Sequence, residues 1–227
     1  MLNPAVIIPT LNEEKNIRTV LQKLRHLGFT NLLVIDGNSK DRTVAVARRL
    51  GVKVIHQNGK GKGDALRQAF NHNGLNAGMI AIMDADGSMN PEELFSFIQR
   101  LKDGADLAKG SRFIGNGGSN DLTLLRRIGN KILVSLVNIL WSTDYTDLCY
   151  GFAVFKKDAL QKLYPYLRSE NFEIETEIFI KAKKLGLKVV EAPSVELRRM
   201  HGKSNLKAYL DGFRILRTII REFMSDT

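Results

Sequence analysis

The strongest constraint on the fold is a repeated alternation of short apolar runs with helical patterns through the first half of this 227-residue chain. The runs are rich in Val and Ile and almost continuous in apolar character, as strands buried on both faces of a parallel sheet are. They lie at residues 5–8, 32–35, 52–55 and 80–83, and a further strand is predicted at 106–110. This order predicts an α/β fold with a twisted, mostly parallel sheet that is covered on both faces by helices.

The segments between the runs carry signals for helix starts. Asn12 is placed as the N-cap of a first helix, with Glu13 in its opening turn, and a second helix is predicted after Ser39. A later helix is expected to have Asn90 as its N-cap, with Glu93 completing a capping box. These signals predict helices that begin directly after the loops at the strand ends.

Two aspartates, Asp84 and Asp86, follow the apolar run at 80–83. Residues two apart in a strand project to the same side, so both carboxylates are expected to face one small volume. Hard divalent cations prefer oxygen ligands, and Mg²⁺ is usually held by one or two carboxylates plus substrate phosphates. The pair predicts a metal-dependent reaction on a diphosphate. The alternative is a solvated turn that is helped by Gly87.

Further polar residues fall at the carboxyl ends of the predicted strands, where parallel sheets bind ligands. These are Pro9 and Thr10, Asp36, and Ser111 with Arg112. Each has a structural alternative when taken singly, for example an Asp36 that only bonds its own turn. The glycine-rich stretch at 59–63 lacks P-loop spacing, so it either brings lysines near a phosphate or forms a flexible turn. The coincidence of so many polar residues at one edge favours a ligand site.

The charge balance points to an anionic partner. The net charge of +10 implies attraction to polyanions such as phosphorylated substrates or anionic lipid, although solubility accounts for part of the excess. No nucleic-acid partner is expected, because zinc-finger spacing and aromatic ribonucleoprotein motifs are missing and aromatic residues make up only 7%. Cys149 is the one cysteine, which fits a reducing compartment. With no signal-peptide pattern and no apolar stretch of ~20 residues, we expect a cytoplasmic protein.

Taken in order, the motifs at these positions resemble family 2 glycosyltransferases of the GT-A fold. Within that family the chain is most similar to dolichyl-phosphate mannose synthases and related polyprenyl-phosphate glycosyltransferases. The similarity spans about residues 4–206. It is carried by Ile7-Ile8-Pro9-Thr10-Leu11-Asn12-Glu13, Val34-Ile35-Asp36-Gly37-Asn38-Ser39, Met83-Asp84-Ala85-Asp86, Gly110-Ser111-Arg112, Phe113-Ile114-Gly115-Asn116-Gly117-Gly118, Thr146-Asp147-Leu148, Gly151-Phe152 and Arg199-Met200-His201-Gly202-Lys203-Ser204.

The resemblance implies a nucleotide-sugar donor, inversion at the anomeric carbon, and Mg²⁺ or Mn²⁺ as cofactor. It implies that the donor site includes Pro9, Glu13 and Asp36 at the nucleoside, Asp84 and Asp86 at the metal with Ala85 between them, Arg112 at a donor or acceptor phosphate, and Arg199 and Ser204 at the phosphates. Three positions depart from the family pattern. Leu11 replaces a usual Tyr, Asn205 replaces a usual Lys, and Ser88 is a weak neutral ligand where Gln is often found.

The acceptor remains open between two classes. A polyprenyl phosphate is already largely ionised at pH 7 and needs no general base, and Arg112 with the pair Arg126-Arg127 would orient it. A sugar or protein hydroxyl requires a carboxylate base, for which Asp147 is the candidate, unless it is a structural acceptor at a turn. Asp86, Asp147 and Arg112 are therefore the catalytic candidates. A non-catalytic nucleotide-binding or membrane-binding module is a further alternative.

Two amphipathic helical patterns bear on the acceptor. Basic amphipathic helices can lie in a membrane interface, although each stripe can instead pack on its own domain. Together with the charge and the resemblance, they predict peripheral binding to the cytoplasmic face of a membrane. We expect one domain over 1–227, with a nucleotide-binding half at about 1–112, an acceptor half at about 113–205 and an amphipathic tail helix at 206–227. The stripes are Leu125, Ile128, Ile132, Leu136 and Ile139, and Leu206, Tyr209, Leu210, Phe213, Leu216 and Ile220.

Overall fold

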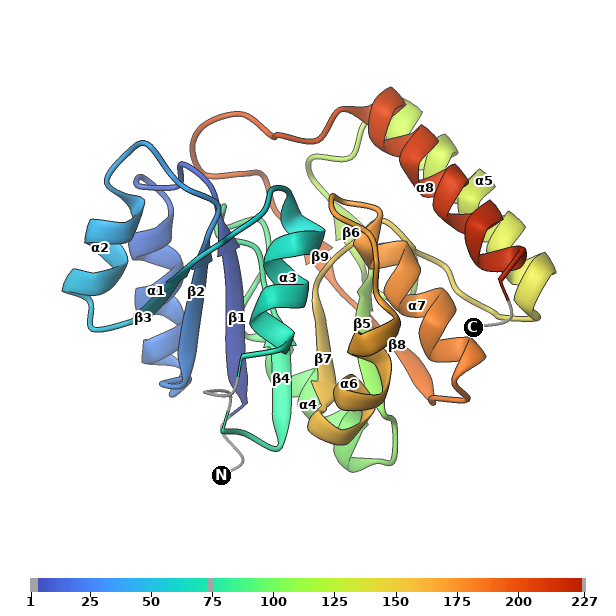
Figure 1. Ribbon diagram of the computed structural model, residues 1–227, viewed down its shortest axis with the longest axis horizontal. Helices are drawn as coiled ribbons and strands as arrows, with labels where there is room; N and C mark the ends of the chain where they lie inside the picture. Colours follow the sequence, from blue (N-terminus) through green and yellow to red (C-terminus); the bar gives the residue numbers. More distant parts are fainter. Residues whose placement is uncertain (1–3, 73–75, 226–227) are drawn as a thin grey trace.

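A seven-stranded sheet forms the centre of the molecule in the computed structural model, which describes residues 4–72 and 76–225 (Figure 1). The strand order is β3-β2-β1-β4-β7-β5-β8. All neighbours are parallel except β7, which pairs antiparallel with both β4 and β5. The mostly parallel sheet is therefore confirmed. The strands are β1 (Ala5–Thr10), β2 (Leu32–Asp36), β3 (Lys53–His56), β4 (Met79–Ile82), β5 (Leu107–Ser111), β7 (Ala153–Lys156) and β8 (Val189–Pro193).

Helices cover both faces of this sheet because successive side chains of its strands point to opposite sides. In β1, Ile8 packs into a core with α1 and α4, whereas Ile7 packs into the core that contains α3 and α7. A small second sheet pairs β6 (Gly118–Ser119) with β9 (Val195–Glu196). The helices are α1 (Ile17–His26), α2 (Thr43–Arg49), α3 (Lys62–Phe70), α4 (Glu93–Lys102), α5 (Leu124–Trp141), α6 (Lys157–Leu163), α7 (Ile174–Lys184) and α8 (Ala208–Phe223).

The first helix begins later than predicted, at Ile17 with Asn16 as its N-cap. Asn12 adopts a left-handed conformation with φ of 57°, so it cannot begin the helix. The backbone N–H of Glu13 instead donates to Thr43 Oγ1 at 2.7 Å, which ties this loop to the start of α2. The prediction that Asn12 caps α1 was wrong. Glu13 precedes the helix, and its side chain is buried.

The predicted start of α4 is also wrong, because the helix begins at Glu93 with Glu92 as its N-cap and the capping box does not form. Asn90 Oδ1 accepts the backbone N–H of Glu92 at 3.3 Å, so Asn90 does satisfy an N–H at this end of the helix. The carboxylate of Glu93, however, accepts the backbone N–H of Val195 at 3.0 Å and the hydroxyl of Ser194. Glu93 thus binds residues about 100 positions away instead of the N-terminal end of its own helix, and this contact holds α4 against β9.

Helices α5 and α8 lie side by side at one edge of the molecule (Figure 1). The face of α8 that is turned inward carries Asp211, Thr218 and Glu222 besides Ile215 and Ile219. Glu222 pairs with Lys181 of α7 at 2.7 Å, and both side chains are buried. Charged contacts therefore help to dock this helix, and its apolar stripe points outward.

The apolar stripes of α5 and α8 are largely exposed, with exposed fractions of 63% for Ile132, 82% for Tyr209 and 66% for Phe213. The alternative that each stripe packs entirely on its own domain is therefore wrong.

Among the described residues, no helix has both the length and the hydropathy needed to cross a membrane.

Candidate functional site

A cavity of about 750 Å³ opens beyond the carboxyl ends of β1, β2 and β4. This is the edge at which the sequence predicts ligand binding. Residues from loops more than 100 positions apart meet there, because the segment that follows β9 folds back over the end of β4. The predicted site residues that line the cavity are Pro9, Glu13, Asp84, Ala85, Asp86, Arg199 and Ser204.

The Asp84 and Asp86 carboxylates lie in the wall of this cavity, with 28% and 19% of their side chains exposed. Asp86 Oδ1 accepts the backbone N–H and the hydroxyl of Ser88 at 2.9 and 2.7 Å, which fixes its orientation. Gly87 makes the turn with φ of +79°, and a Cβ there would lie 2.4 Å from Cε of Met200. The positive φ of this turn favours glycine, whereas a Cβ would meet only the flexible Met200 side chain.

Each of the two aspartates is paired with a cation. Lys62 Nζ lies 2.7 Å from Asp84 Oδ1, and Arg199 Nη1 lies 3.0 Å from Asp86 Oδ2. Arg199 also binds the carboxylate of Glu13, and Lys62 binds Glu175 Oε1 at 2.7 Å. The result is a compact group of alternating charges at the cavity wall, which we call the cavity cluster: Glu13, Lys62, Asp84, Asp86, Glu175 and Arg199.

The environment shifts the ionisation of this cluster. Burial raises the pKa of Glu13 above its ordinary value of 4.5, against the lowering effects of Asn16 and Arg199. Burial alone lowers the pKa of Lys62, but Asp84 and Glu175 more than compensate and raise it above that of an ordinary lysine. Burial also raises the pKa of Glu175, although Lys62 opposes this shift. Lys62 therefore carries its charge at neutral pH.

The donor set of the cavity cluster suits a hard divalent cation. Asp84 and Asp86 offer carboxylate oxygens, which Mg²⁺ and Mn²⁺ prefer, and the two cations that pair with them mark positions where positive charge is stabilised. Within residues 4–72 and 76–225 there is no group of three or more His, Cys, Asp or Glu side chains that could hold a metal. A cation held by Asp84 and Asp86 would therefore need further oxygen ligands, which a diphosphate and water can supply.

Asp36 lies below the cavity wall rather than in it, with only 1% of the residue exposed. Its carboxylate accepts the backbone N–H of Ser39 at 3.0 Å and the Ser39 hydroxyl at 2.6 Å. These bonds shape the turn whose residues Gly37 and Asn38 do line the cavity. Leu11, which departs from the family pattern, also lines it and is 41% exposed.

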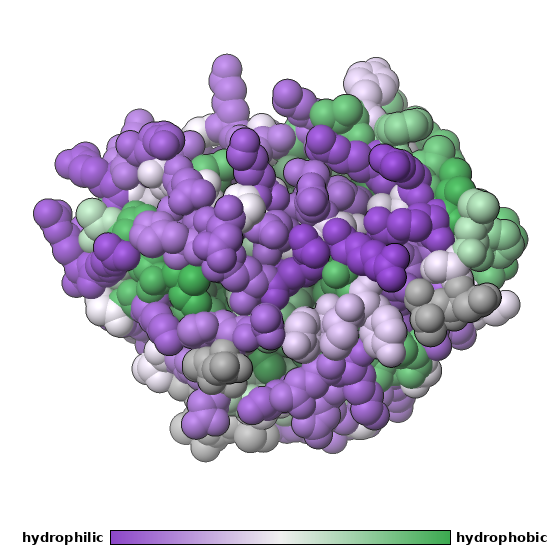
Figure 2. Space-filling view, viewed as in Figure 1, coloured by the Kyte–Doolittle hydropathy of each residue, from purple (hydrophilic) through white to green (hydrophobic). Residues whose placement is uncertain are grey.

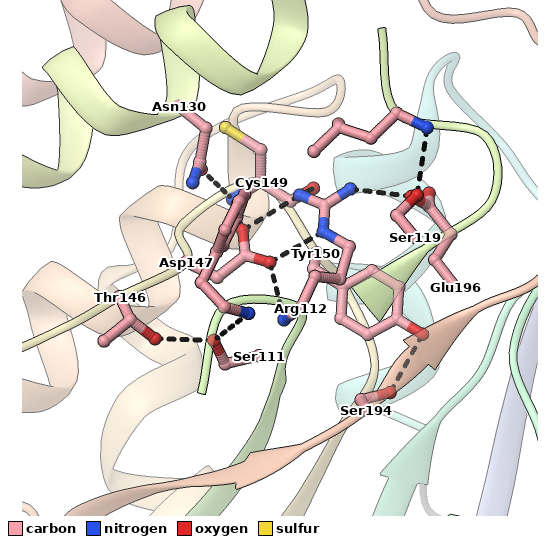
Figure 3. A network of polar contacts seen from close by, with 12 residues as sticks. Ser111, Arg112, Ser119, Asn130, Thr146, Asp147, Cys149, Tyr150, Ser194 and Glu196 are labelled. Atoms are coloured by element: carbon pink, nitrogen blue, oxygen red, sulfur yellow. Dashed lines mark hydrogen bonds and ion pairs between the residues drawn. The ribbon is translucent and has the colours of Figure 1, made fainter. Parts of the chain in front are cut away.

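Arg112 and Asp147 form a buried ion pair, and neither lines the cavity (Figure 3). Asp147 accepts Arg112 Nε at 2.7 Å and Nη2 at 2.9 Å, and its side chain has no exposed surface. Arg112 Nη1 donates to Glu196 at 3.0 Å, and Glu196 also accepts the hydroxyl of Ser119. We call Arg112, Asp147 and Glu196 the buried cluster.

The buried cluster bears on two of the predicted roles. A base must reach the proton of the acceptor, but both oxygens of Asp147 are already engaged by Arg112 and by the backbone N–H of Cys149. The guanidinium of Arg112 is likewise committed to Asp147 and Glu196, and its side chain is 1% exposed. This geometry argues against a base role for Asp147 and a direct phosphate contact for Arg112.

Comparison with known proteins decides the family. Residues 5–164 match the model of the family described as Glycosyl transferase family 2. The chain belongs to glycosyltransferase family 2. The family resemblance carried by the motifs is thereby confirmed, and so is the GT-A-like fold of this glycosyltransferase.

Relatives of this glycosyltransferase span nearly its whole length. Glycosyltransferase AglJ of Haloferax volcanii is 32% identical over 208 residues, which cover 91% of this chain and 67% of that protein. The UDP-N-acetylglucosamine–dolichyl-phosphate N-acetylglucosaminyltransferase of Methanococcus voltae is 29% identical, with 92% of each chain covered. The polyprenol monophosphomannose synthase of Mycolicibacterium smegmatis is 31% identical, with 88% of this chain and 80% of that protein covered.

Among solved structures, the fold is similar to that of glucosyl-3-phosphoglycerate synthase from Mycobacterium tuberculosis, crystallised with Mn²⁺, uridine diphosphate and phosphoglyceric acid. The TM-score is 0.76 at 19% identity, with 96% of this chain and 78% of that chain covered. At this identity the likeness shows the fold of the glycosyltransferase.

The far end of the cavity reaches the starts of α5 and α8. Arg126, Lys207, Leu210 and Arg214 line this part. Arg126 lies 3.7 Å from Asp121 and 4.0 Å from Glu196, and Arg214 pairs with Asp211 at 2.9 Å. The glycosyltransferase therefore places basic side chains where its cavity meets the two amphipathic helices.

Lys62 and Glu175 are the site residues that are least apparent from the sequence. The glycine-rich stretch at 59–63 predicts lysines near a phosphate as one of two alternatives, and the structure brings Lys62 to Asp84. Glu175 lies in the first turn of α7, and no local pattern distinguishes it from any other acid at such a position. Only the packing of α7 against α3 brings it to Lys62.

Proposed function

We propose that this glycosyltransferase moves a hexose from a nucleoside diphosphate sugar to a polyprenyl phosphate, in a metal-dependent and inverting reaction. One observation carries the proposal. A single cavity joins the Asp84 and Asp86 carboxylates to Arg126 and Arg214, at the starts of two helices whose apolar faces are exposed. A charged headgroup with a long apolar tail is the class of acceptor that fits such an arrangement.

The donor end of the cavity suits a nucleoside diphosphate sugar of the GDP-mannose or UDP-glucose type. Pro9, Leu11 and Glu13 would border the nucleoside, and Asp84 and Asp86 would hold Mg²⁺ or Mn²⁺ together with the diphosphate. When bound, the cation would supply positive charge against the leaving diphosphate. Arg199, already beside Asp86, would add fixed positive charge at the same group, which lowers the barrier to its departure.

A polyprenyl phosphate acceptor would need no general base. A phosphate monoester has a second pKa of about 6, so its oxygen is already a nucleophile at neutral pH. Arg126 and Arg214 would orient that phosphate for in-line attack on the anomeric carbon. Asp147 would then serve as the buried counter-ion of Arg112, a structural role that agrees with the burial of the Asp147 side chain.

The polyprenyl tail would leave the cavity along α5 and α8. Apolar side chains gather along the edge where these helices lie (Figure 2), among them Phe213 and Ile220. Exposed basic residues such as Arg127, Lys131 and Arg217 accompany them. We therefore propose peripheral contact with an anionic membrane surface on the cytoplasmic side, where such charges each contribute about 1 kcal/mol.

The names of two relatives support the acceptor class, since one is named for transfer to dolichyl phosphate and the other for making polyprenol monophosphomannose. Within the proposed single domain, residues of about 1–112 would bind the donor, those of about 113–205 would complete the acceptor side, and 206–227 would provide the membrane-facing helix.

The test is transfer of labelled sugar from a panel of GDP- and UDP-sugars into organic-extractable lipid, with a short polyprenyl phosphate as acceptor. We expect product with at least one donor, and loss of that product on chelation with EDTA. Transfer to a soluble hydroxyl acceptor with no lipid product, together with inactivity of Asp147→Asn in a folded protein, would contradict the proposal and favour a soluble glycosyltransferase.

A further inference from the structure

Lys62 is buried at a position that is electrostatically unfavourable for a cation. It is the first residue of α3, and the positive end of a helix dipole disfavours positive charge. Its side chain is only 7% exposed, yet it carries its charge because Asp84 and Glu175 each lie 2.7 Å from Nζ. A lysine needed only to link two helices could form such a link at the surface, away from the cavity.

The surrounding backbone is built around this lysine. Gly61 and Gly63, on either side, lie so close to the loop at 169–171 that a Cβ on either would come within 2.3 Å of a carbonyl oxygen. The backbone N–H of Gly63 donates to that loop, at 2.8 Å from the carbonyl oxygen of Glu170. A Cβ on Gly151 would lie 2.8 Å from Nζ of Lys62 and 2.4 Å from Oε1 of Glu175. Residues 61–63 are therefore packed closely against the loop at 169–171, and glycine at 151 leaves space for the Lys62 ammonium group.

We propose that Lys62 is an exchangeable counter-ion of Asp84. It holds this carboxylate when no divalent cation is present, and it releases Asp84 to the cation that arrives with the donor diphosphate. Glu175 retains the lysine in either state, because it is bound to Nζ from the side of α7. The inference rests on the proposed metal site at Asp84 and Asp86, and it adds a positioning role for Lys62 and Glu175.

The exchange predicts strong coupling between metal and nucleotide. A free cation must displace a buried lysine from Asp84 and gains only carboxylate ligands in return. A cation that arrives with a diphosphate also gains phosphate oxygens, and the displaced ammonium gains an anionic neighbour. The nucleotide should therefore tighten metal binding, and by linkage the metal should tighten nucleotide binding by the same factor.

The competing explanation is that Lys62 serves only to connect α3 to α7 through Glu175. Both explanations predict some loss of stability when Lys62 is replaced, so stability does not separate them. They differ in the affinity of the protein for a divalent cation when no nucleotide is bound. Removal of a competing cation strengthens that affinity, whereas removal of a structural link leaves it unchanged or weakens it.

The experiment is a titration of the full chain with Mn²⁺, followed by the electron paramagnetic resonance signal of the free ion, without nucleotide and with UDP or GDP. We expect Lys62→Met to bind Mn²⁺ about tenfold more tightly than the unaltered protein when nucleotide is absent, and to gain less from added nucleotide. Lys162→Met, which alters an exposed lysine of α6 outside the cavity, is the matched control and should reproduce the unaltered protein.

Two further variants distinguish the proposed exchange from a general loss of structure. Glu175→Gln should weaken Mn²⁺ binding, since of the two carboxylates that pair with Lys62 it removes the one that does not compete for the cation. The double variant Lys62→Met with Glu175→Gln removes one charge of each sign and should still bind Mn²⁺ more tightly than the unaltered protein. Opposite effects of the two single variants are not expected from loss of structure.

The outcomes separate this inference from the proposed function. Mn²⁺ binding that requires Asp84 and Asp86 but is unchanged or weaker in Lys62→Met and in the double variant would overturn the exchange and leave the metal site intact. No Mn²⁺ binding by the unaltered protein, with or without nucleotide, would overturn both.

Discussion

The cavity cluster and the buried cluster contain the same kinds of side chain and use them differently. In both, an aspartate pairs with a cation at 2.7 Å: Asp84 with Lys62, and Asp147 with Arg112. The cavity pair borders an open volume with 28% of the Asp84 side chain exposed, whereas the Asp147 side chain is fully enclosed. Exposure to the cavity leaves a carboxylate able to change partners, and enclosure commits it to one.

Enclosure also changes what each cluster contributes to stability. Removing one partner from a buried pair leaves an uncompensated charge without water, which is strongly destabilising. The carboxylates of the cavity cluster are crowded by burial and by one another, as the raised pKa values of Glu13 and Glu175 show. The buried cluster should therefore matter for folding and the cavity cluster for activity.

The sharpest test of this division is Asp84→Ala and Asp86→Ala. We expect either change to lower sugar transfer by about a thousandfold or more, because charge stabilisation at the leaving group is lost. The free energy of unfolding should change by less than about 1 kcal/mol, since both side chains are partly exposed and Lys62 and Arg199 keep Glu175 and Glu13 as partners. Transfer assays and urea denaturation on the same preparations measure both effects. Substantial transfer by both variants would show that these two carboxylates of the cavity cluster are not needed for catalysis.

Arg112→Met should show the opposite pattern. It leaves Asp147 and Glu196 buried without their cation, so we expect a loss of about 3–5 kcal/mol in the free energy of unfolding. Urea denaturation measures the loss. Arg127→Met, which changes an exposed arginine of α5, is the matched control and should stay within about 0.5 kcal/mol of the unaltered protein. Equal stability of the two variants would show that enclosure does not distinguish the clusters.

A third test concerns the outward apolar face that borders the acceptor end. Phe213→Ser combined with Ile220→Ser removes two exposed side chains from α8. We expect co-sedimentation with anionic liposomes to weaken by about tenfold or more, because less apolar surface enters the interface. Phe95→Ser, at a side chain of α4 that is 51% exposed, should retain binding. Similar losses in both would point to non-specific adhesion.

The smallest expected effect is on the pH dependence of stability. Burial raises the pKa of Glu13 above 4.5, so near and above that pH the folded protein holds more protons than the unfolded chain. Stability therefore falls as pH rises from about 4.5 through the pKa of Glu13 in the folded state. Glu13→Gln should remove this part of the slope, as urea denaturation from pH 4 to 8 would show in the difference between the two curves. An unchanged slope would mean that the pKa of Glu13 is the same in the folded and the unfolded protein.

Much of the fold and of the site could be predicted because local patterns decide it. Continuous apolar runs predict β1, β2, β3 and β4, and the position of Asp84 and Asp86 just after β4 places them at the edge where ligands bind. The start of α1 was misplaced because the N–H of Glu13 is taken by Thr43, which lies in another helix. The capping box failed for a similar reason, since Glu93 binds Val195 instead.

The sequence by itself determined the strands of the first half of the chain, the family motifs and the existence of two amphipathic helices. Only the tertiary structure decided that Asp84 faces a cavity while Asp147 is enclosed, that Lys62 meets Glu175, and that the apolar stripe of α8 points outward. The reason is physical. The ionisation and freedom of a charged side chain depend on burial and on the partner within about 3 Å, and in this protein those partners come from distant parts of the chain.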